Sequence, residues 1–178
     1  MYHIKKDKRS ETSANLIVLG FYRCLEKTPV QKLTISQICK EAGVGRTTFY
    51  RLFDEIIDIL IFQCDKEFAD ILSEMSKFNG DYRFLIEKWL KKKDLITAIM
   101  HCNRFDLLFN VHMNNTSKIK NFFSIEQSLT TNQLNYLMSI LTSILVGNIH
   151  SWIINGGQET VDDILNQLEL FKKSINLN

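Results

Sequence analysis

The sequence predicts an all-α protein on three observations. The 178 residues include a single proline, Pro29, and seven glycines, so few residues interrupt a helix. Apolar side chains recur at the three- and four-residue spacing of amphipathic helices, and no alternation typical of strands persists. A chain of this length can bury a substantial core, either as one compact domain or as two small ones that share a helix.

The first helix is expected from about Ser10 to Thr28, with Pro29 close behind its end. Five apolar residues would form its buried stripe: Ala14, Ile17, Val18, Phe21 and Leu25. Four basic residues open the chain: Lys5, Lys6, Lys8 and Arg9. They form either a flexible basic arm or a plain disordered terminus.

Two short helices joined by a tight turn are predicted between Leu33 and Phe53. Thr34 and Gln37 fit a capping box at the start of the first one. Its apolar stripe, spaced i, i+3, i+4 and i+7, consists of Ile35, Ile38, Cys39 and Ala42. Gly43 follows, where a left-handed residue commonly ends a helix. In the second helix the side expected to face the core carries Phe49, Leu52 and Phe53.

The opposite side of that second helix is basic and polar. Arg46, Thr47, Tyr50 and Arg51 are spaced so that they project together. Arginine can pair with O6 and N7 of guanine, and a threonine methyl can contact the methyl of thymine. Tyrosine and the second arginine suit phosphate oxygens. The pattern predicts a helix-turn-helix that reads the major groove; the alternative is an ordinary helical hairpin with a solvated basic face.

This segment resembles the N-terminal domain of the TetR/AcrR family of bacterial transcriptional regulators, in which the run T-x-x-x-I-x-x-x-A-G-V-S-x-x-T-F-Y-x-x-F is typical. The residues that match are Thr34, Ile38, Ala42, Gly43, Val44, Thr48, Phe49, Tyr50 and Phe53. With this resemblance, we expect the DNA interface to consist of Thr34, Gly45, Arg46, Thr47, Tyr50 and Arg51. Gly45 replaces the family's capping serine, which weakens the cap but allows close approach to phosphate. The family's lysine after the final Phe is missing, because Glu55, Ile56 and Ile57 stand there.

The charge distribution supports the same reading. Residues 1–53 carry ten Lys or Arg and four Asp or Glu, a net charge of +6. The remainder carries twelve Lys or Arg and sixteen Asp or Glu, a net charge of −4. A basic head on an acidic body suits salt-dependent binding to phosphates; the alternative is a solvated basic face with no partner.

The predicted organisation is a DNA-binding head, residues 1–53, and a regulatory and dimerisation domain, residues 54–178. A long amphipathic helix, from about Asp54 to Met75, would join them, and Asn79-Gly80 would break the chain after it. Shorter helices are predicted near 81–91, 93–102 and 104–123, the last one interrupted by the polar run 114–117.

The last two predicted helices indicate a homodimer. From about Thr131 to Asn155 the chain is apolar on two sides, but polar residues interrupt it too often for a membrane span. Such a helix needs two partners, its own core and something else, and another amphipathic helix follows from about Glu159. Two helices from each subunit would form a four-helix bundle. The residues expected at this interface are Leu141, Ile144, Leu145, Trp152, Ile164 and Leu168.

The family resemblance also implies a small-molecule effector that binds the body and favours one of two states. Candidates for its pocket are Phe62, Tyr82, Trp89, Phe105 and Met113, although core packing is the commoner role of such residues. His101, Cys102 and His112 complete no recognisable ligand set, so we expect neither a metal nor a cofactor.

These observations leave three classes of function. The first is a TetR-like repressor that binds a palindromic operator as a homodimer and is released by an effector. The second is a TetR-fold coactivator or interaction partner that does not bind DNA, which the missing lysine near Ile56 leaves open. The third, an enzyme, is not expected, because no phosphate loop, nucleophile elbow or catalytic set is recognisable. Four scattered cysteines and the lack of an apolar leader predict a cytoplasmic location.

Overall fold

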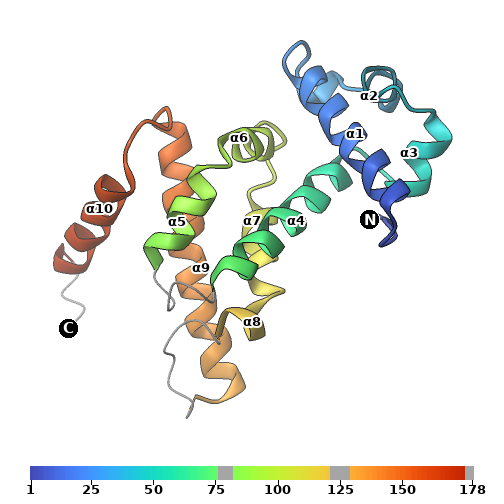
Figure 1. Cartoon of the computed structure of the whole chain (residues 1–178). Coiled ribbons are helices and arrows are strands. Elements are labelled where there is room, and N and C mark those ends of the chain that lie inside the picture. Colours follow the sequence, from blue (N-terminus) through green and yellow to red (C-terminus); the bar gives the residue numbers. More distant parts are fainter. Residues whose placement is uncertain (76–81, 121–128, 175–178) are drawn as a thin grey trace. The chain divides into compact units, whose positions relative to one another are not determined.

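A computed structural model of the chain describes residues 1–75, 82–120 and 129–174, and its helices are shown in Figure 1. In these ranges the regular elements are ten α-helices and one 3-10 turn, with a single isolated bridge between Tyr2 and Phe53. The all-α prediction is confirmed. The predicted break at Asn79-Gly80 and the end of the helix predicted at 104–123 lie outside the described residues.

The chain divides into two compact units. The first comprises residues 1–67 and 97–107, and the second comprises residues 68–96 and 108–178. The division falls within α4 (Ile57–Met75) and again within α6 (Lys93–His101), and not at residue 53. Sequence periodicity identifies a continuous helix such as α4, but it does not reveal where one core ends and the next begins along it.

The first unit is built on α1 (Lys8–Leu25), η1 (Val30–Lys32), α2 (Ile35–Ala42) and α3 (Arg46–Leu52). α1 begins two residues earlier than predicted because Asp7 caps it, its carboxylate accepting the Ser10 N–H at 2.9 Å. Lys8 and Arg9 therefore belong to the first helical turn, and the predicted flexible or disordered segment is wrong for these two. Four residues of the predicted α1 stripe are buried, and the fifth, Leu25, is half-buried.

The second unit contains α5 (Tyr82–Leu90), most of α7 (Asp106–Met113), α8 (Thr116–Lys120), α9 (Thr131–Ile154) and α10 (Val161–Ser174). α9 starts at a capping box formed by Thr130 and Gln133. α5 packs against α9 and α10, and Arg83 pairs with Asp162 at the start of α10. The core of this unit includes Phe68, whose ring stacks on that of Trp89.

The two apolar sides of α9 have different environments. Leu145 and Trp152, together with Ile164 of α10, are buried within the chain, so they belong to its own core. Leu141, Ile144 and Leu168 are half-buried. The exposed large apolar side chains of these two helices are Tyr136, Ile140, Ile154, Leu170 and Phe171. Within the described residues, α9 is also the one helix that is long and apolar enough, by length and composition alone, to cross a membrane.

Candidate nucleic-acid interface

The helix-turn-helix forms from strong local signals. Thr34 and Gln37 make both hydrogen bonds of the predicted capping box, and Gly43 ends α2 with φ of 66°. The N–H of Val44 returns to the carbonyl oxygen of Cys39 at 3.0 Å, which closes the turn. Gly45 precedes α3 without a side-chain cap, as expected from the missing serine. The Thr34 hydroxyl donates to Gln37 Oε1 at 2.8 Å, so this side chain stabilises the start of α2.

The second helix, α3, separates a buried side from an exposed one. Phe49 and Leu52 are buried, as is Phe53 just after the helix, and this part of the prediction is confirmed. The side chains on the other face, Arg46, Thr47, Tyr50 and Arg51, are exposed. Tyr50 remains 48% exposed although its ring meets that of Phe49 edge-on. The polar and cationic side chains of α3 therefore project into solvent, while the opposite side of the helix is packed in the core.

The two arginines of this face stay unpaired among the described residues, whereas several acids of the first unit already have partners. Glu41 accepts from Lys27 at 3.0 Å, and this contact lowers the pKa of Glu41. Asp7 is occupied as the cap of α1, and its pKa is lowered by hydrogen bonds from Ser10. No carboxylate in the described part of the chain forms an ion pair with Arg46 or Arg51. Both guanidinium groups are thus available to a polyanion.

The start of α4 differs from the family pattern in charge as well as in sequence. The buried Asp58 accepts the backbone N–H groups of Asp54 and Glu55, at 3.0 and 3.1 Å, and thereby fixes the turn that precedes α4. Ile56, at the position where the family has its lysine, is half-buried. Asp54 and Glu55 are exposed at this end of α4, and Asp54 is already paired with the Met1 ammonium group and with His3.

Residues 1–4, which we call the strap, form a structured segment that the sequence pattern does not predict. The His3 N–H donates to the carbonyl oxygen of Leu52, the last residue of α3, at 2.8 Å. The Tyr2 hydroxyl donates to Asp65 of α4 at 2.8 Å, and burial, together with this contact, raises the pKa of Tyr2 to about 12. Tyr2 and Ile4 alternate with polar residues, but four residues are too few for a period-2 signal to predict an ordered segment.

The five residues expected to form an effector pocket belong to different units. Phe62 and Phe105 lie in the first unit, whereas Tyr82, Trp89 and Met113 lie in the second. Trp89 is fully buried in the core beside Phe68. Tyr82 borders a cavity of about 10 Å³, which has room for about one water molecule.

Both ring nitrogens of His112, a residue considered as a metal ligand from its sequence context, have hydrogen-bond partners within the protein. Its Nε2 accepts the indole N–H of Trp89 at 3.2 Å, and its Nδ1 faces the carbonyl oxygen of Leu108 at 2.7 Å. Because a carbonyl oxygen can only accept, the ring is the neutral tautomer with its proton on Nδ1. Over the residues that the structure describes, no group of three or more His, Cys, Asp or Glu is placed to hold a metal ion.

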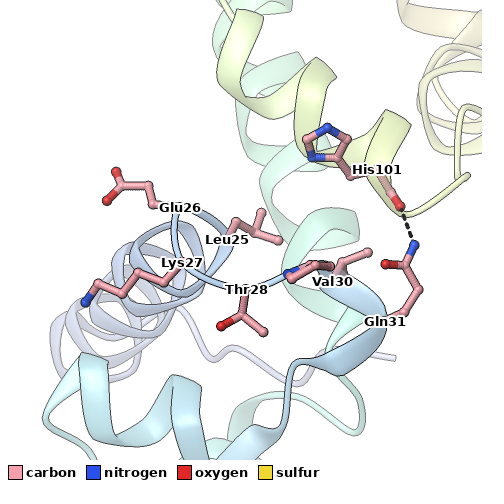
Figure 2. A pocket seen from close by; sticks show the side chains of 8 residues that line it. Leu25, Glu26, Lys27, Thr28, Val30, Gln31 and His101 are labelled. Carbon is pink, nitrogen blue, oxygen red and sulfur yellow. Dashed lines mark hydrogen bonds between the residues drawn. The ribbon is translucent and has the colours of Figure 1, made fainter.

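A second surface feature of the first unit is a hollow of about 430 Å³ between the segment after α1 and the end of α6 (Figure 2). The Gln31 side chain crosses it to donate to the carbonyl oxygen of His101 at 3.2 Å. Figure 2 shows the charged ends of Glu26 and Lys27 directed away from His101. The lining side chains do not converge on a common point, so the hollow has no recognisable binding chemistry.

Comparison with known proteins gives relatives of one kind. No protein-family model matches the chain. Two curated relatives, the uncharacterised HTH-type transcriptional regulators MT2310 and Rv2250c of Mycobacterium tuberculosis strains CDC 1551 and H37Rv, are each 29% identical over 84 residues. The match covers 44% of this chain and 44% of each relative, so the chain spans less than half the length of these regulators. The helix-turn-helix geometry described above agrees with the class of these relatives.

Solved structures share the fold at low sequence identity. Lin0861 from Listeria innocua superposes with a TM-score of 0.75 and 17% identity, over 97% of this chain and 96% of that one. The fatty acid degradation regulator FadR from Bacillus halodurans gives a TM-score of 0.52 and 14% identity, over 92% and 93% of the two chains. These two structures establish the likeness of fold along nearly the whole chain.

Proposed function

We propose that this protein is a TetR-like transcriptional regulator that binds double-stranded DNA through α3. The exposed face of α3 carries the proposal, since Arg46 and Arg51 project from a helix whose other side is buried. Arg46 and Thr47 would contact base edges in the major groove. Tyr50 and Arg51 would contact phosphates and fix the register. The HTH-type relatives support DNA as the partner.

The protein would act as a homodimer that binds a palindromic operator. One recognition helix covers few base pairs, so specificity requires two half-sites about 34–36 Å apart. The contact face would be the exposed side of α9, with Ile140, Ile144 and Ile154, together with the exposed Phe171 of α10. Gly147 lies on the same side, and a Cβ built there meets nothing within 4 Å in the chain itself. Its own fold does not require a glycine at this position, whereas a closely packed second helix would.

Binding to this operator would repress transcription by blocking polymerase, and an effector bound to the second unit would release it. The apolar character of α9 would then serve the core and the dimer contact of a cytoplasmic protein. We propose a binding role and no catalytic one.

The decisive experiment selects DNA with matched variants. The purified protein is incubated with sheared genomic DNA from its source, and the bound fragments are sequenced. Arg46→Ala is run in parallel with Lys91→Ala, which removes an exposed cation from the second unit. We expect one recurrent palindrome for the parent protein and for Lys91→Ala, and its loss in Arg46→Ala. Equal enrichment of that palindrome by Arg46→Ala would refute base readout by α3.

A second function is favoured by the start of α4. Asp54, Glu55 and Ile56 stand where a family regulator would approach the DNA backbone with a lysine, and the two carboxylates are exposed. This surface suits a coactivator that keeps the fold and binds a protein partner. Failure of the parent protein to enrich any fragment at low salt, where phosphate contacts are strongest, would favour this alternative.

A further inference from the structure

A hollow of about 310 Å³ opens in the first unit where the strap meets α1 and α4. Its apolar surface comes from Tyr2, Ile4 and Phe62, and the rings of Tyr2 and Phe62 meet edge-to-face with centroids 5.4 Å apart. This volume falls within the range of small-molecule sites. Phe62, expected from the sequence to serve an effector pocket in the body, thus borders a hollow in the DNA-binding unit.

The rim of this hollow is cationic. Lys5, Lys6 and Lys66 line it, against the single carboxylate of Glu11. The ammonium group of Lys66 donates to the side-chain oxygen of Asn15 at 3.1 Å, which holds the lysine at the rim. The nearby carboxylate of Asp65 accepts the Tyr2 hydroxyl and is not among the lining groups.

We propose that this hollow binds a small organic anion, with a carboxylate, sulfonate or phosphate head at the lysines and a short apolar body on Tyr2, Ile4 and Phe62. Each exposed lysine contributes little alone, so binding requires several cations and the apolar surface together. A DNA backbone phosphate would use the lysines but would make no use of the apolar lining that Tyr2, Ile4 and Phe62 present to the hollow. The combination of the two surfaces therefore favours an organic acid over a nucleic acid.

The position of the hollow connects it to the recognition helix. Between its lining residues Tyr2 and Ile4 stands His3, whose N–H holds the last carbonyl group of α3 at Leu52. An acid bound against the strap would stabilise its existing contact with the C-terminal end of α3 and so change the affinity of α3 for DNA. This coupling rests on the proposed function, whereas the binding of the acid does not. Any such effect is reciprocal, because DNA must change the affinity for the acid by the same factor.

Three probes with one apolar body test the site: 4-phenylbutanoate, 4-phenylbutan-1-ol and 4-phenylbutylamine, each titrated calorimetrically into the full chain. We expect the acid to bind tightest and the amine weakest. Lys66→Gln should lower the affinity for the acid roughly threefold, and the double variant Lys6→Gln/Lys66→Gln should lower it roughly tenfold. Lys91→Gln, a lysine of the second unit, should leave it unchanged. Equal affinities for acid and alcohol, or for the parent and the double variant, would overturn the proposal.

A second titration, with duplex DNA, separates the site from the proposed function. Binding of the acid to a protein that binds no duplex would leave the site standing and remove the regulatory role. A protein that binds its operator but not the acid would refute the site alone. Displacement of the acid by a duplex even from Arg46→Ala/Arg51→Ala, which lacks both cations of α3, would assign the lysines to phosphate contacts and overturn the proposal.

Discussion

Gly20 of α1 packs directly against Ala42 of α2: a Cβ built on Gly20 would lie 2.8 Å from the Cβ of Ala42. The same atom would lie 2.8 Å from the carbonyl oxygen of Ile38. Both neighbours are backbone atoms or directly attached to the backbone, so they cannot move aside as the end of a long side chain could. The absence of a side chain at Gly20 therefore sets the distance between α1 and the first helix of the helix-turn-helix.

Replacing Gly20 with alanine should destabilise the first unit. Overpacking of this kind costs about 1–3 kcal/mol, and the better helix propensity of alanine returns at most ~1 kcal/mol. Urea unfolding followed by circular dichroism measures the net change. Leu19→Ala, a truncation of the 52% exposed neighbour, serves as control and should change the free energy of unfolding by less than about 0.5 kcal/mol. A Gly20→Ala variant as stable as this control would contradict the packing described here.

The two arginines of α3 should differ in what they contribute to DNA binding. Arg46→Ala should weaken the free energy of binding to the selected operator by about 1–3 kcal/mol and relax the preference for one base pair. Arg51→Ala should lower the affinity for all duplexes alike. It should also reduce the slope of log affinity against log salt concentration by about one. Fluorescence anisotropy over a range of salt concentrations, on operator and unrelated duplexes, distinguishes these effects. A uniform loss in both variants would mean that neither arginine reads bases.

The exposed and buried sides of α9 should respond differently to a charge. Ile140→Glu places the carboxylate on a side chain that is 56% exposed, so the chain should stay folded while the dimer dissociates. Leu145→Glu places it at a residue that is 1% exposed and should unfold the second unit instead. Sedimentation velocity measures whether each variant is still a dimer, and circular dichroism measures whether it is still folded. An undisturbed dimer in both Ile140→Glu and Ile154→Glu would place the interface elsewhere.

Local chemistry explains why so much of the helix-turn-helix could be predicted from sequence. The capping box of Thr34 and the left-handed Gly43 are decided by residues at most a few positions away. The buried and exposed faces of α3 then follow from helical spacing alone. The same reasoning predicted both apolar sides of α9 but could not tell which one the chain itself buries. That choice depends on contacts with α5, which lies far away in sequence.

Contacts between distant residues account for what the sequence could not predict. The strap is held by pairs such as Tyr2 with Asp65, which are 63 residues apart, and no periodic pattern records them. The hollow that the strap helps to form was invisible for the same reason. Phe62 is a pocket candidate by sequence, with core packing as the commoner role, but its partners Tyr2 and Phe53 are apparent only in the fold.

Buried His112 should make the stability of the second unit depend on pH. Burial lowers the pKa of His112 to about 4, from the ordinary value of 6.5, and the contact with Leu108 only partly opposes this. Above about pH 6.5 the ring is neutral in both states and contributes no pH dependence. Between about pH 6.5 and 4 the unfolded chain binds a proton that the folded chain does not. Stability should therefore fall with falling pH in that window, by up to about 1.4 kcal/mol per unit.

Urea unfolding at about pH 7.5, 6 and 5, compared between the parent and His112→Phe, isolates this contribution, because the carboxylates are common to both proteins. The free energy of unfolding of His112→Phe should be about 1–3 kcal/mol lower than that of the parent near pH 7.5, since the Trp89 indole N–H is left without its acceptor. As the pH falls, the free energy of unfolding of His112→Phe should decrease less than that of the parent. His150→Gln changes an exposed histidine and should retain the parent's pH dependence. Parallel curves for the parent and His112→Phe would show that His112 binds its proton as readily in the folded protein as in the unfolded chain, which would contradict the lowered pKa.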